Sequence, residues 1–143
     1  MIILKKMNID EIREYLLERP RTGKLATLKK DGSPHVSPIW FDLDDDGNIV
    51  FITRAGYLKN ENIRRDPRVA LCVDDEQPPF SYVIVEGRVI IPENQDPFQY
   101  WSTRISGRYM DDDNYAKRYS AETGYSLVVL KPTKILGYTN ITD

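Results

Sequence analysis

A two-residue alternation of side chains, repeatedly interrupted by tight-turn residues, is the feature that most constrains the fold of this sequence. From Lys24 the chain alternates with the period of a β-strand, and Asp31-Gly32 then supplies the residues that a tight hairpin requires. A second run ends in acidic residues and Gly47-Asn48, which lead into a β-branched and aromatic segment. The sequence therefore predicts an antiparallel three-strand meander at 24–30, 33–43 and 49–53.

Four further strands and four helices are predicted in the rest of the chain. Strand-forming composition resumes at 69–73, 80–91, 125–130 and 134–138. Helical patterns occupy 8–19, 57–65, 95–106 and 113–121. Asn8 and Glu11 form a capping-box pattern for the first helix, and Asp66-Pro67 ends the second.

These elements fit a single domain spanning 1–143, since ordinary domains run to about 100–150 residues. Many antiparallel strands with short turns and interposed helices favour a closed or nearly closed β-barrel with helices over its openings. The first helix is expected to place Ile9, Ile12, Leu16 and part of Tyr15 against the core. The expected fold class is therefore mainly β, or α+β.

The scarcity of histidine and cysteine limits the chemistry. The sequence has one histidine, His35, and one cysteine, Cys72. An internal disulfide, a structural zinc and an iron–sulfur cluster are therefore excluded. A Ser-His-Asp or Cys-His arrangement would need His35, which lies at a strand start instead of a strained nucleophile turn. We therefore predict no catalytic side chain and no metal ligand, and expect a bound cofactor to supply any chemistry.

Charge and hydropathy exclude several classes of partner. Twenty Lys and Arg residues against 22 Asp and Glu give a net charge of -2, without the basic excess of a phosphate-tracking surface. No apolar run approaches the ~20 residues that span a bilayer. The sequence therefore predicts a cytoplasmic protein that binds neither nucleic acid nor membrane.

One acidic motif, Asp42-x-Asp44-x-Asp46-Gly47, matches the first half of a calcium-binding loop. Its twelfth position is Thr53, where an EF-hand needs a bidentate glutamate, and its flanks alternate like strands. We therefore interpret the motif as a solvated hairpin turn.

The strand-to-helix junction from Thr53 to Asn62 is the first candidate binding site. Free backbone N–H groups and the helix dipole favour an anion at a helix N-terminus. Lys59 and Asn62 share one face of the first turns, so both could hold a phosphate, and Thr53 could add a hydroxyl. The alternative is a solvated amphipathic helix.

The second candidate site is the run from Val36 to Phe41, in which Pro38 interrupts a strand. Proline confines such a stretch to a sheet edge or a bulge and leaves backbone groups unpaired. Together with Trp40, these groups could bind the edge of a planar ring. The alternative is that Trp40 belongs to the core.

An aromatic ridge lies on the third helix. It consists of Phe98, Tyr100 and Trp101. A single small barrel is not expected to bury all three of these large side chains. A dimer interface would bury them.

Several stretches, in their order and spacing, resemble the flavin/deazaflavin oxidoreductases. These are split-barrel proteins related to pyridoxamine 5′-phosphate oxidase, and the likeness is to the branch that uses the deazaflavin coenzyme F420. The stretches are 24–28, 31–34, 37–41, 59–69 and 85–87, and the likeness covers about 25–89. It implies a six-stranded antiparallel split β-barrel with flanking helices, which forms a homodimer with cofactor sites between its subunits.

The resemblance also implies roles for single residues. Lys59 and Asn62 match the positions that hold the cofactor phosphate, and Thr53 lies beside them. The residues that border the ring system are Ser37, Pro38, Ile39 and Trp40. Some relatives carry a basic residue two positions before Lys59, where this chain has Tyr57, so an altered grip on the phosphate or the polyglutamate tail is expected.

The leading hypothesis from the sequence is an F420-dependent reductase that transfers a hydride from the reduced deazaflavin to a small planar or conjugated substrate. Such a cofactor delivers the hydride from its own ring, so the protein need only orient ring and substrate, without His or Cys. The same barrel with FMN, as an oxidase or reductase, is one alternative. The others are a non-catalytic cofactor-binding protein and a plain interaction module.

Overall fold

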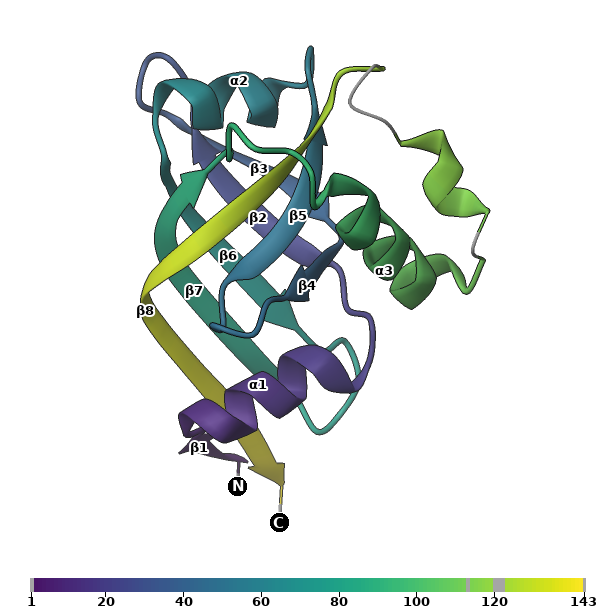
Figure 1. The fold of residues 1–143 in the computed structure, drawn as a ribbon. Coiled ribbons are helices and arrows are strands. Elements are labelled where there is room, and N and C mark those ends of the chain that lie inside the picture. Colours follow the sequence, from purple (N-terminus) through teal and green to yellow (C-terminus); the bar gives the residue numbers. More distant parts are fainter. Residues whose placement is uncertain (1, 113, 120–122, 143) are drawn as a thin grey trace.

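The computed structural model describes residues 2–112, 114–119 and 123–142. Eight strands, three α-helices and one 3₁₀ helix follow one another along these residues (Figure 1). In chain order they are β1 (Ile2–Lys6), α1 (Ile9–Glu18), β2 (Gly23–Leu28), β3 (Pro34–Ile39), β4 (Phe41–Leu43), β5 (Ile49–Arg54), α2 (Leu58–Arg65), β6 (Arg68–Asp74), β7 (Ser81–Ile90), α3 (Phe98–Met110), η1 (Tyr115–Arg118) and β8 (Tyr125–Thr142).

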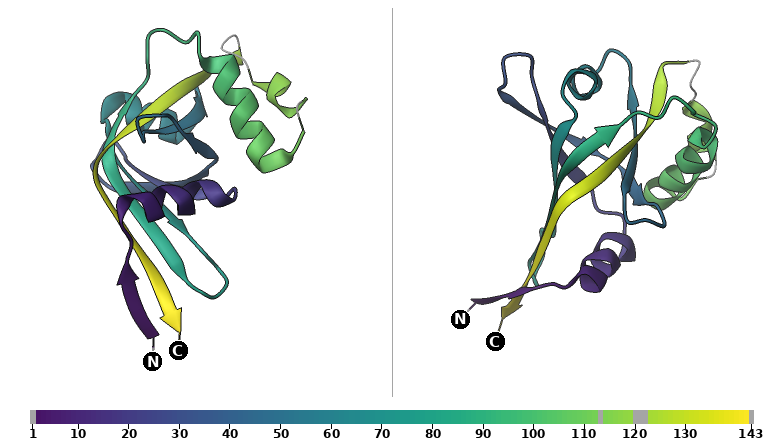
Figure 2. Two further views of the ribbon diagram at one scale, coloured as in Figure 1. Left: turned by 60° about the horizontal axis from the view of Figure 1, so that its bottom comes forward. Right: turned by 60° about the vertical axis from the view of Figure 1, so that its left-hand side comes forward.

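The strands form one antiparallel sheet in the order β3-β2-β6-β7-β8-β5-β4. Its two outermost strands, β3 and β4, are neighbours in the chain and are separated by Trp40 alone. The sheet therefore has to curl until its edges approach each other, as Figures 1 and 2 show. This curled sheet is consistent with the predicted split barrel and confirms the mainly β class.

The structure does not confirm the strand count of six. The predicted strand 33–43 is divided at Trp40, and β1, which the sequence analysis left without an element, pairs with the end of β8 (Figure 2). The two strands predicted at 125–130 and 134–138 are one strand, β8. A register shift opposite Pro132, at Gly87, lets the ladder between β7 and β8 continue past the proline.

The core fills the inside of the curled sheet. Its fully buried side chains include Leu25, Phe41, Phe51, Leu71 and Val83. Each belongs to a different strand, so burying these side chains together fixes the curvature as well as the strand pairing.

Helices α1 and α2 lie at opposite ends of the curled sheet (Figure 1). Ile12, Tyr15 and Leu16 of α1 are buried, as predicted, whereas Ile9 is 62% exposed. Ile9 is the first residue of the helix. That part of the prediction was wrong.

The remaining helices match the sequence prediction to different degrees. Helix α2 ends before Asp66-Pro67, as predicted. Helix α3 starts at Phe98 and runs on to Met110, where Asp111 takes a left-handed conformation with φ 49°. Within the described part of the predicted helix 113–121, the chain forms only the 3₁₀ turn η1; residues 113, 120 and 121 lie outside the described residues.

The acidic motif forms a hairpin turn between β4 and β5, as interpreted from the sequence. The Asp44 carboxylate accepts hydrogen bonds from the backbone N–H groups of Asp46 and Asn48, at 2.9 and 2.8 Å.

None of the helices within the described ranges has the length and apolar character that a bilayer span requires.

Candidate functional site

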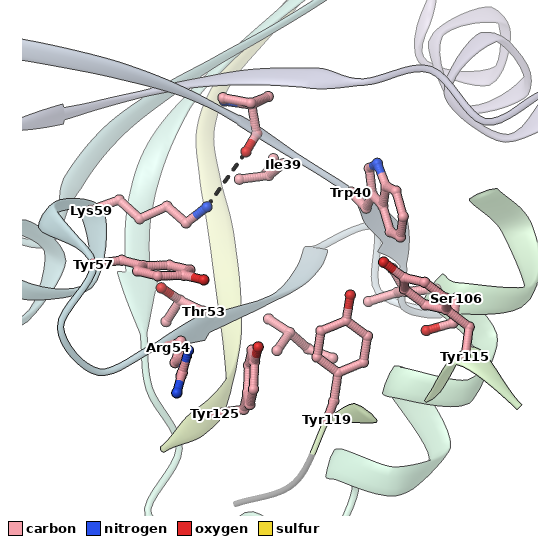
Figure 3. A pocket seen from close by; sticks show the side chains of 13 residues that line it. Ile39, Trp40, Thr53, Arg54, Tyr57, Lys59, Ser106, Tyr115, Tyr119 and Tyr125 are labelled. Atoms are coloured by element: carbon pink, nitrogen blue, oxygen red, sulfur yellow. Dashed lines mark hydrogen bonds between the residues drawn. The ribbon is translucent and has the colours of Figure 1, made fainter. Parts of the chain in front are cut away.

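A pocket of about 400 Å³ opens where the curled sheet fails to close. Strands β4 and β5 pair over three residues, from Phe41 opposite Phe51 to Leu43 opposite Ile49. Beyond that ladder, residues 38–40 and 52–54 line the two sides of the gap (Figure 3). The complete lining is Pro38, Ile39, Trp40, Ile52, Thr53, Arg54, Tyr57, Lys59, Ile105, Ser106, Tyr115, Tyr119 and Tyr125.

The pocket is bordered by strand edges that have no ladder partner on its side. In the described sheet, β3 pairs with β2 alone, and residues 52–54 of β5 pair with β8 alone. Their outward backbone groups are therefore available for other hydrogen bonds. Pro38 thus lies in an edge strand, as predicted, but the ladder between β2 and β3 continues past it, so the predicted interruption of the ladder was wrong.

Lys59 reaches across one end of the gap. It is the second residue of α2, and its Nζ donates a 3.4 Å hydrogen bond to the Pro38 carbonyl (Figure 3). Within the described part of the chain, no carboxylate lies within ion-pair distance of this ammonium. Burial of the side chain lowers the pKa of Lys59. A half-buried ammonium without a carboxylate partner is stabilised when an anionic ligand binds beside it.

The N-terminus of α2 lies beside Lys59 and has no side-chain cap. Tyr57 is the N-cap residue and forms no capping hydrogen bond. No carbonyl among the described residues accepts from the backbone N–H of Leu58 or Lys59. Gly56, with φ 93°, makes the turn from strand to helix that leaves these donors free. They favour an anion at the same end of the pocket as Lys59.

Thr53 lines the pocket from β5 with a buried hydroxyl. The residue is 1% exposed, and its Oγ1 has no hydrogen-bond partner among the described residues. A buried hydroxyl without a partner costs about 1–3 kcal/mol. A ligand oxygen in the pocket would remove this cost, so Thr53, Lys59 and the helix N-terminus together fit a phosphate-bearing cofactor.

The opposite end of the pocket is aromatic. The Trp40 ring stacks on Tyr109, with 5.0 Å between ring centroids and 6° between planes, and lies 5.8 Å from Tyr115. Tyr119 meets Tyr125 edge-on at 4.9 Å. Figure 3 shows Trp40, Tyr115 and Tyr119 across the pocket from Lys59. Trp40 is thus a pocket wall and not a core residue, and the pocket can accept a planar ring.

The family model for pyridoxamine 5′-phosphate oxidase matches residues 9–138 of this sequence. The chain belongs to the pyridoxamine 5′-phosphate oxidase family. This confirms the flavin/deazaflavin resemblance read from the sequence, and it places the pocket in a family of cofactor-binding barrels.

Solved structures agree with this family membership. A conserved hypothetical protein from Mycobacterium tuberculosis superposes with a TM-score of 0.80 at 27% identity, covering 93% of this chain and 85% of its own. An F420 reductase is 29% identical, with a TM-score of 0.68 and coverage of 85% and 94%. A FAD-binding protein from Mesorhizobium loti, 19% identical with a TM-score of 0.74 and coverage of 99% and 100%, shares the fold.

The structure brings together most of the predicted site residues of this family member. Thr53, Tyr57 and Lys59 line the polar end, and Pro38, Ile39 and Trp40 line the neighbouring strand. Tyr57 is 48% exposed, and its ring lies 5.9 Å from the Lys59 ammonium. The start of α2 and the strand that contains Pro38 therefore lie side by side, as predicted, although the strand is divided at Trp40 and not at Pro38.

Asn62 and Ser37 do not line the pocket. The Asn62 side chain is fully buried, donates to Thr27 Oγ1 at 3.0 Å and accepts from Arg65 at 2.9 Å. Its short side chain faces β2, whereas the long side chain of Lys59 extends out to the gap. Asn62 thus fixes α2 to the sheet, which corrects its predicted place beside the phosphate. Ser37 lies one residue before the lining, and its buried Oγ has no partner among the described residues.

Sequence reasoning missed four pocket residues that bring charge or aromatic rings. Arg54 ends β5 next to Thr53, and this adjacency was visible in the sequence. The other three are Tyr115 in η1, Tyr119 directly after η1, and Tyr125 at the start of β8, all more than 60 residues further along the chain than Thr53. Only the spacing of tyrosines in 115–125 hinted at an aromatic surface there. Burial raises the pKa of Tyr119, so its hydroxyl stays protonated and remains a hydrogen-bond donor.

Proposed function

We propose that this protein is an F420-dependent oxidoreductase that reduces a small planar or conjugated substrate. The observation that carries the proposal is the division of one pocket into a cationic, donor-rich end and an aromatic end. F420 has the matching parts, an acidic phosphate-bearing chain and a flat deazaflavin ring. The 29% identity to an F420 reductase supports the choice of cofactor.

In this proposal the polar end holds the phosphate. Lys59 contributes charge, Thr53 contributes a hydroxyl, and the first N–H groups of α2 contribute directional donors. These groups are fixed by the fold before a ligand arrives, so little reorganisation is needed on binding.

The aromatic end orients the ring. The Trp40 ring is held in place by Tyr109, whose hydroxyl donates a 2.6 Å hydrogen bond to the Arg21 carbonyl. Pro38 and Ile39 line the strand side of the pocket, where the Pro38 carbonyl accepts from Lys59 Nζ and so fixes the distance between β3 and the start of α2. A reduced deazaflavin supplies a hydride from its own ring when bound, so no side chain of this chain is assigned as catalytic. The chain positions the ring and substrate and excludes water.

FMN is the second candidate cofactor. It also joins a flat ring to a phosphate, and the family name and the FAD-binding structural relative favour a flavin. With FMN the protein would act as an oxidase or reductase. A non-catalytic carrier of either cofactor has the same pocket and differs only in the absence of turnover.

We further propose a cytoplasmic homodimer in which the partner subunit completes the pocket, as the family resemblance implies. The aromatic ridge of α3 supports an interface: Phe98 is buried, but Tyr100 is 56% exposed. Light scattering is expected to give the mass of a dimer, and a stable monomer would contradict this part of the proposal.

Titration of the purified protein with F420 and with FMN, at matched ionic strength, tests the function. We expect tighter binding of F420, followed by oxidation of reduced F420 when enones or quinones are added. Tighter binding of FMN would favour the second candidate. Binding without turnover across the panel would favour the non-catalytic carrier, and no binding of either cofactor would refute the proposal.

A further inference from the structure

The charged residues in the described lining of the pocket are all of one sign. Of its 13 described lining residues, two are cationic, Lys59 and Arg54, and none is Asp or Glu. The whole chain is acidic, with a net charge of -2. A pocket with two cations and no lining carboxylate, in an acidic protein, concentrates positive potential where a ligand binds.

Arg54 stands at the rim of the pocket, at the end of β5. The next residue, Ala55, is tied to the start of β8 by a 2.9 Å hydrogen bond from its N–H to the Gly124 carbonyl. The Arg54 Nε donates to the Thr123 carbonyl at 3.4 Å, and the guanidinium lies 5.5 Å from the Tyr125 ring centroid. Among the described residues, no group accepts a hydrogen bond from the terminal nitrogens of this guanidinium. Arg54 is therefore anchored but still able to bind an anion.

The two cations differ in depth. Lys59 is half-buried and its ammonium points into the gap toward Pro38, whereas Arg54 is exposed. Figure 3 shows their side chains extending from opposite sides of Thr53. A single phosphate monoester held at Lys59, Thr53 and the α2 N-terminus leaves Arg54 without a ligand group. A ligand with a second negative group further along its chain would engage both.

We infer that the pocket selects ligands with two separate anionic groups, an inner phosphate held at Lys59 and an outer carboxylate held at Arg54. This inference rests on the proposed function and makes Arg54 a specificity-determining residue. F420 joins its phosphodiester to a carboxylate-bearing tail, whereas FMN ends at its phosphate. Arg54 therefore discriminates between the two candidate cofactors, while Lys59 serves both.

The test measures the affinity of F420, FMN and the phosphate-free ribityl deazaflavin for the wild type, Arg54→Ala, Lys59→Ala and Arg64→Ala. Arg64 is an exposed cation of α2 outside the pocket lining, so its variant controls for net charge. We expect Arg54→Ala to weaken F420 binding about five-fold, as for an exposed ion pair, and to leave FMN and the phosphate-free ligand nearly unchanged. Lys59→Ala should weaken both phosphate-bearing ligands.

Equal losses for F420 and FMN in Arg54→Ala, or the same loss in Arg64→Ala, would overturn the inference and reduce the effect to general electrostatics. An unchanged F420 affinity in Arg54→Ala would overturn it as well, while a retained Lys59→Ala effect would leave the proposed function standing. Failure of the wild type to bind any of the three ligands would refute the proposed function and the inference together. Raising the salt concentration should weaken F420 binding more in the wild type than in Arg54→Ala.

Discussion

The N-termini of helices α1 and α2 differ in whether a side chain caps their free backbone N–H groups. Each helix starts with backbone N–H groups that have no partner within the helix. In α1 the Asn8 side chain accepts from the Glu11 N–H at 2.8 Å, and the Glu11 side chain accepts from the Asn8 N–H at 3.1 Å. In α2 the cap position is Tyr57, which forms no such bond. The N-terminus of α1 is therefore capped by its own side chains, whereas the N-terminus of α2 is uncapped and lies beside the pocket.

The charged residues in the first turns of the two helices also differ. The first turn of α1 carries Asp10 and Glu11, which complement the positive end of the helix dipole. The first turn of α2 carries Lys59 as well as Glu61, and Arg54 lies just before it at the end of β5, so this helix start is less acidic than that of α1. A cation at a helix N-terminus is unfavourable for the isolated protein. We interpret the start of α1 as stabilised by its own side chains, and the uncapped start of α2 as a place where an anionic ligand supplies the missing acceptor.

The largest effect is expected from Lys59→Ala. Loss of a charge-assisted hydrogen bond should weaken binding of a phosphate-bearing cofactor by about 1.5–3 kcal/mol, or roughly 10- to 150-fold. The melting temperature without ligand should change little, because the ammonium has no carboxylate partner among the described residues and its hydrogen bond to the Pro38 carbonyl is long, at 3.4 Å. Calorimetric titration and thermal unfolding measure the two quantities. Lys59→Arg is the control that keeps the charge, and unchanged affinity in the alanine variant would remove Lys59 from the site.

The reverse pattern is expected from Asn8→Ala. Removing the cap of α1 should lower the free energy of unfolding by about 1 kcal/mol, because the Glu11 N–H loses its acceptor. Cofactor affinity should stay unchanged, since α1 lies at the other end of the curled sheet. Denaturant unfolding and cofactor titration on one preparation check this. A parallel loss of affinity would mean that the two helix ends are coupled.

Thr53→Val tests the contribution of a single buried hydroxyl beside the uncapped N-terminus of α2. Valine keeps the shape of threonine and removes a buried hydroxyl that has no partner among the described residues, so the ligand-free protein should be as stable or slightly more stable. Cofactor binding should weaken by about 0.5–1 kcal/mol. Thr27→Val is the matched control, because its hydroxyl accepts from Asn62 and the loss should appear in stability instead. A destabilised Thr53→Val protein with full affinity would contradict the assignment.

The smallest effect is a pH dependence that has opposite signs for stability and binding. Burial lowers the pKa of Lys59, so the folded protein releases this proton at a lower pH than the unfolded chain does. Above the folded pKa and up to the unfolded value of about 10.4, the unfolded chain holds more protons, and the stability contribution rises with pH. Anion affinity falls over the same range as Lys59 becomes neutral. Thermal unfolding and titration at several pH values should show both trends in the difference between the wild type and Lys59→Ala, because the other titrating groups contribute equally to the two proteins.

Local patterns in the sequence predicted the elements that depend on neighbouring residues. The Asp31-Gly32 hairpin, the capping box at Asn8 and the end of α2 at Asp66-Pro67 all follow from short-range turn and capping chemistry. The division of 33–43 at Trp40 and the fusion of two predicted strands into β8 depend on pairing across the sheet. Periodicity along one segment contains no such information.

The candidate site was predictable to a similar extent. Thr53 and Lys59 were identified because a strand-to-helix junction is a local feature. Asn62 was misplaced because its direction is decided by Thr27, 35 residues earlier in the chain. Tyr119 and Tyr125 were missed because they reach the pocket only through the curl of the sheet and the packing of α3 and η1. The aromatic half of the site is therefore a property of the tertiary structure.

A crystal structure with F420 bound would decide whether the start of α2 holds the cofactor phosphate. We expect the phosphate to lie within hydrogen-bond distance of Lys59 Nζ, Thr53 Oγ1 and the first N–H groups of α2, with the deazaflavin ring extending toward Trp40. A cofactor bound in the reverse orientation, or outside the gap between β3 and β5 while Lys59 still contacts only the Pro38 carbonyl, would contradict it.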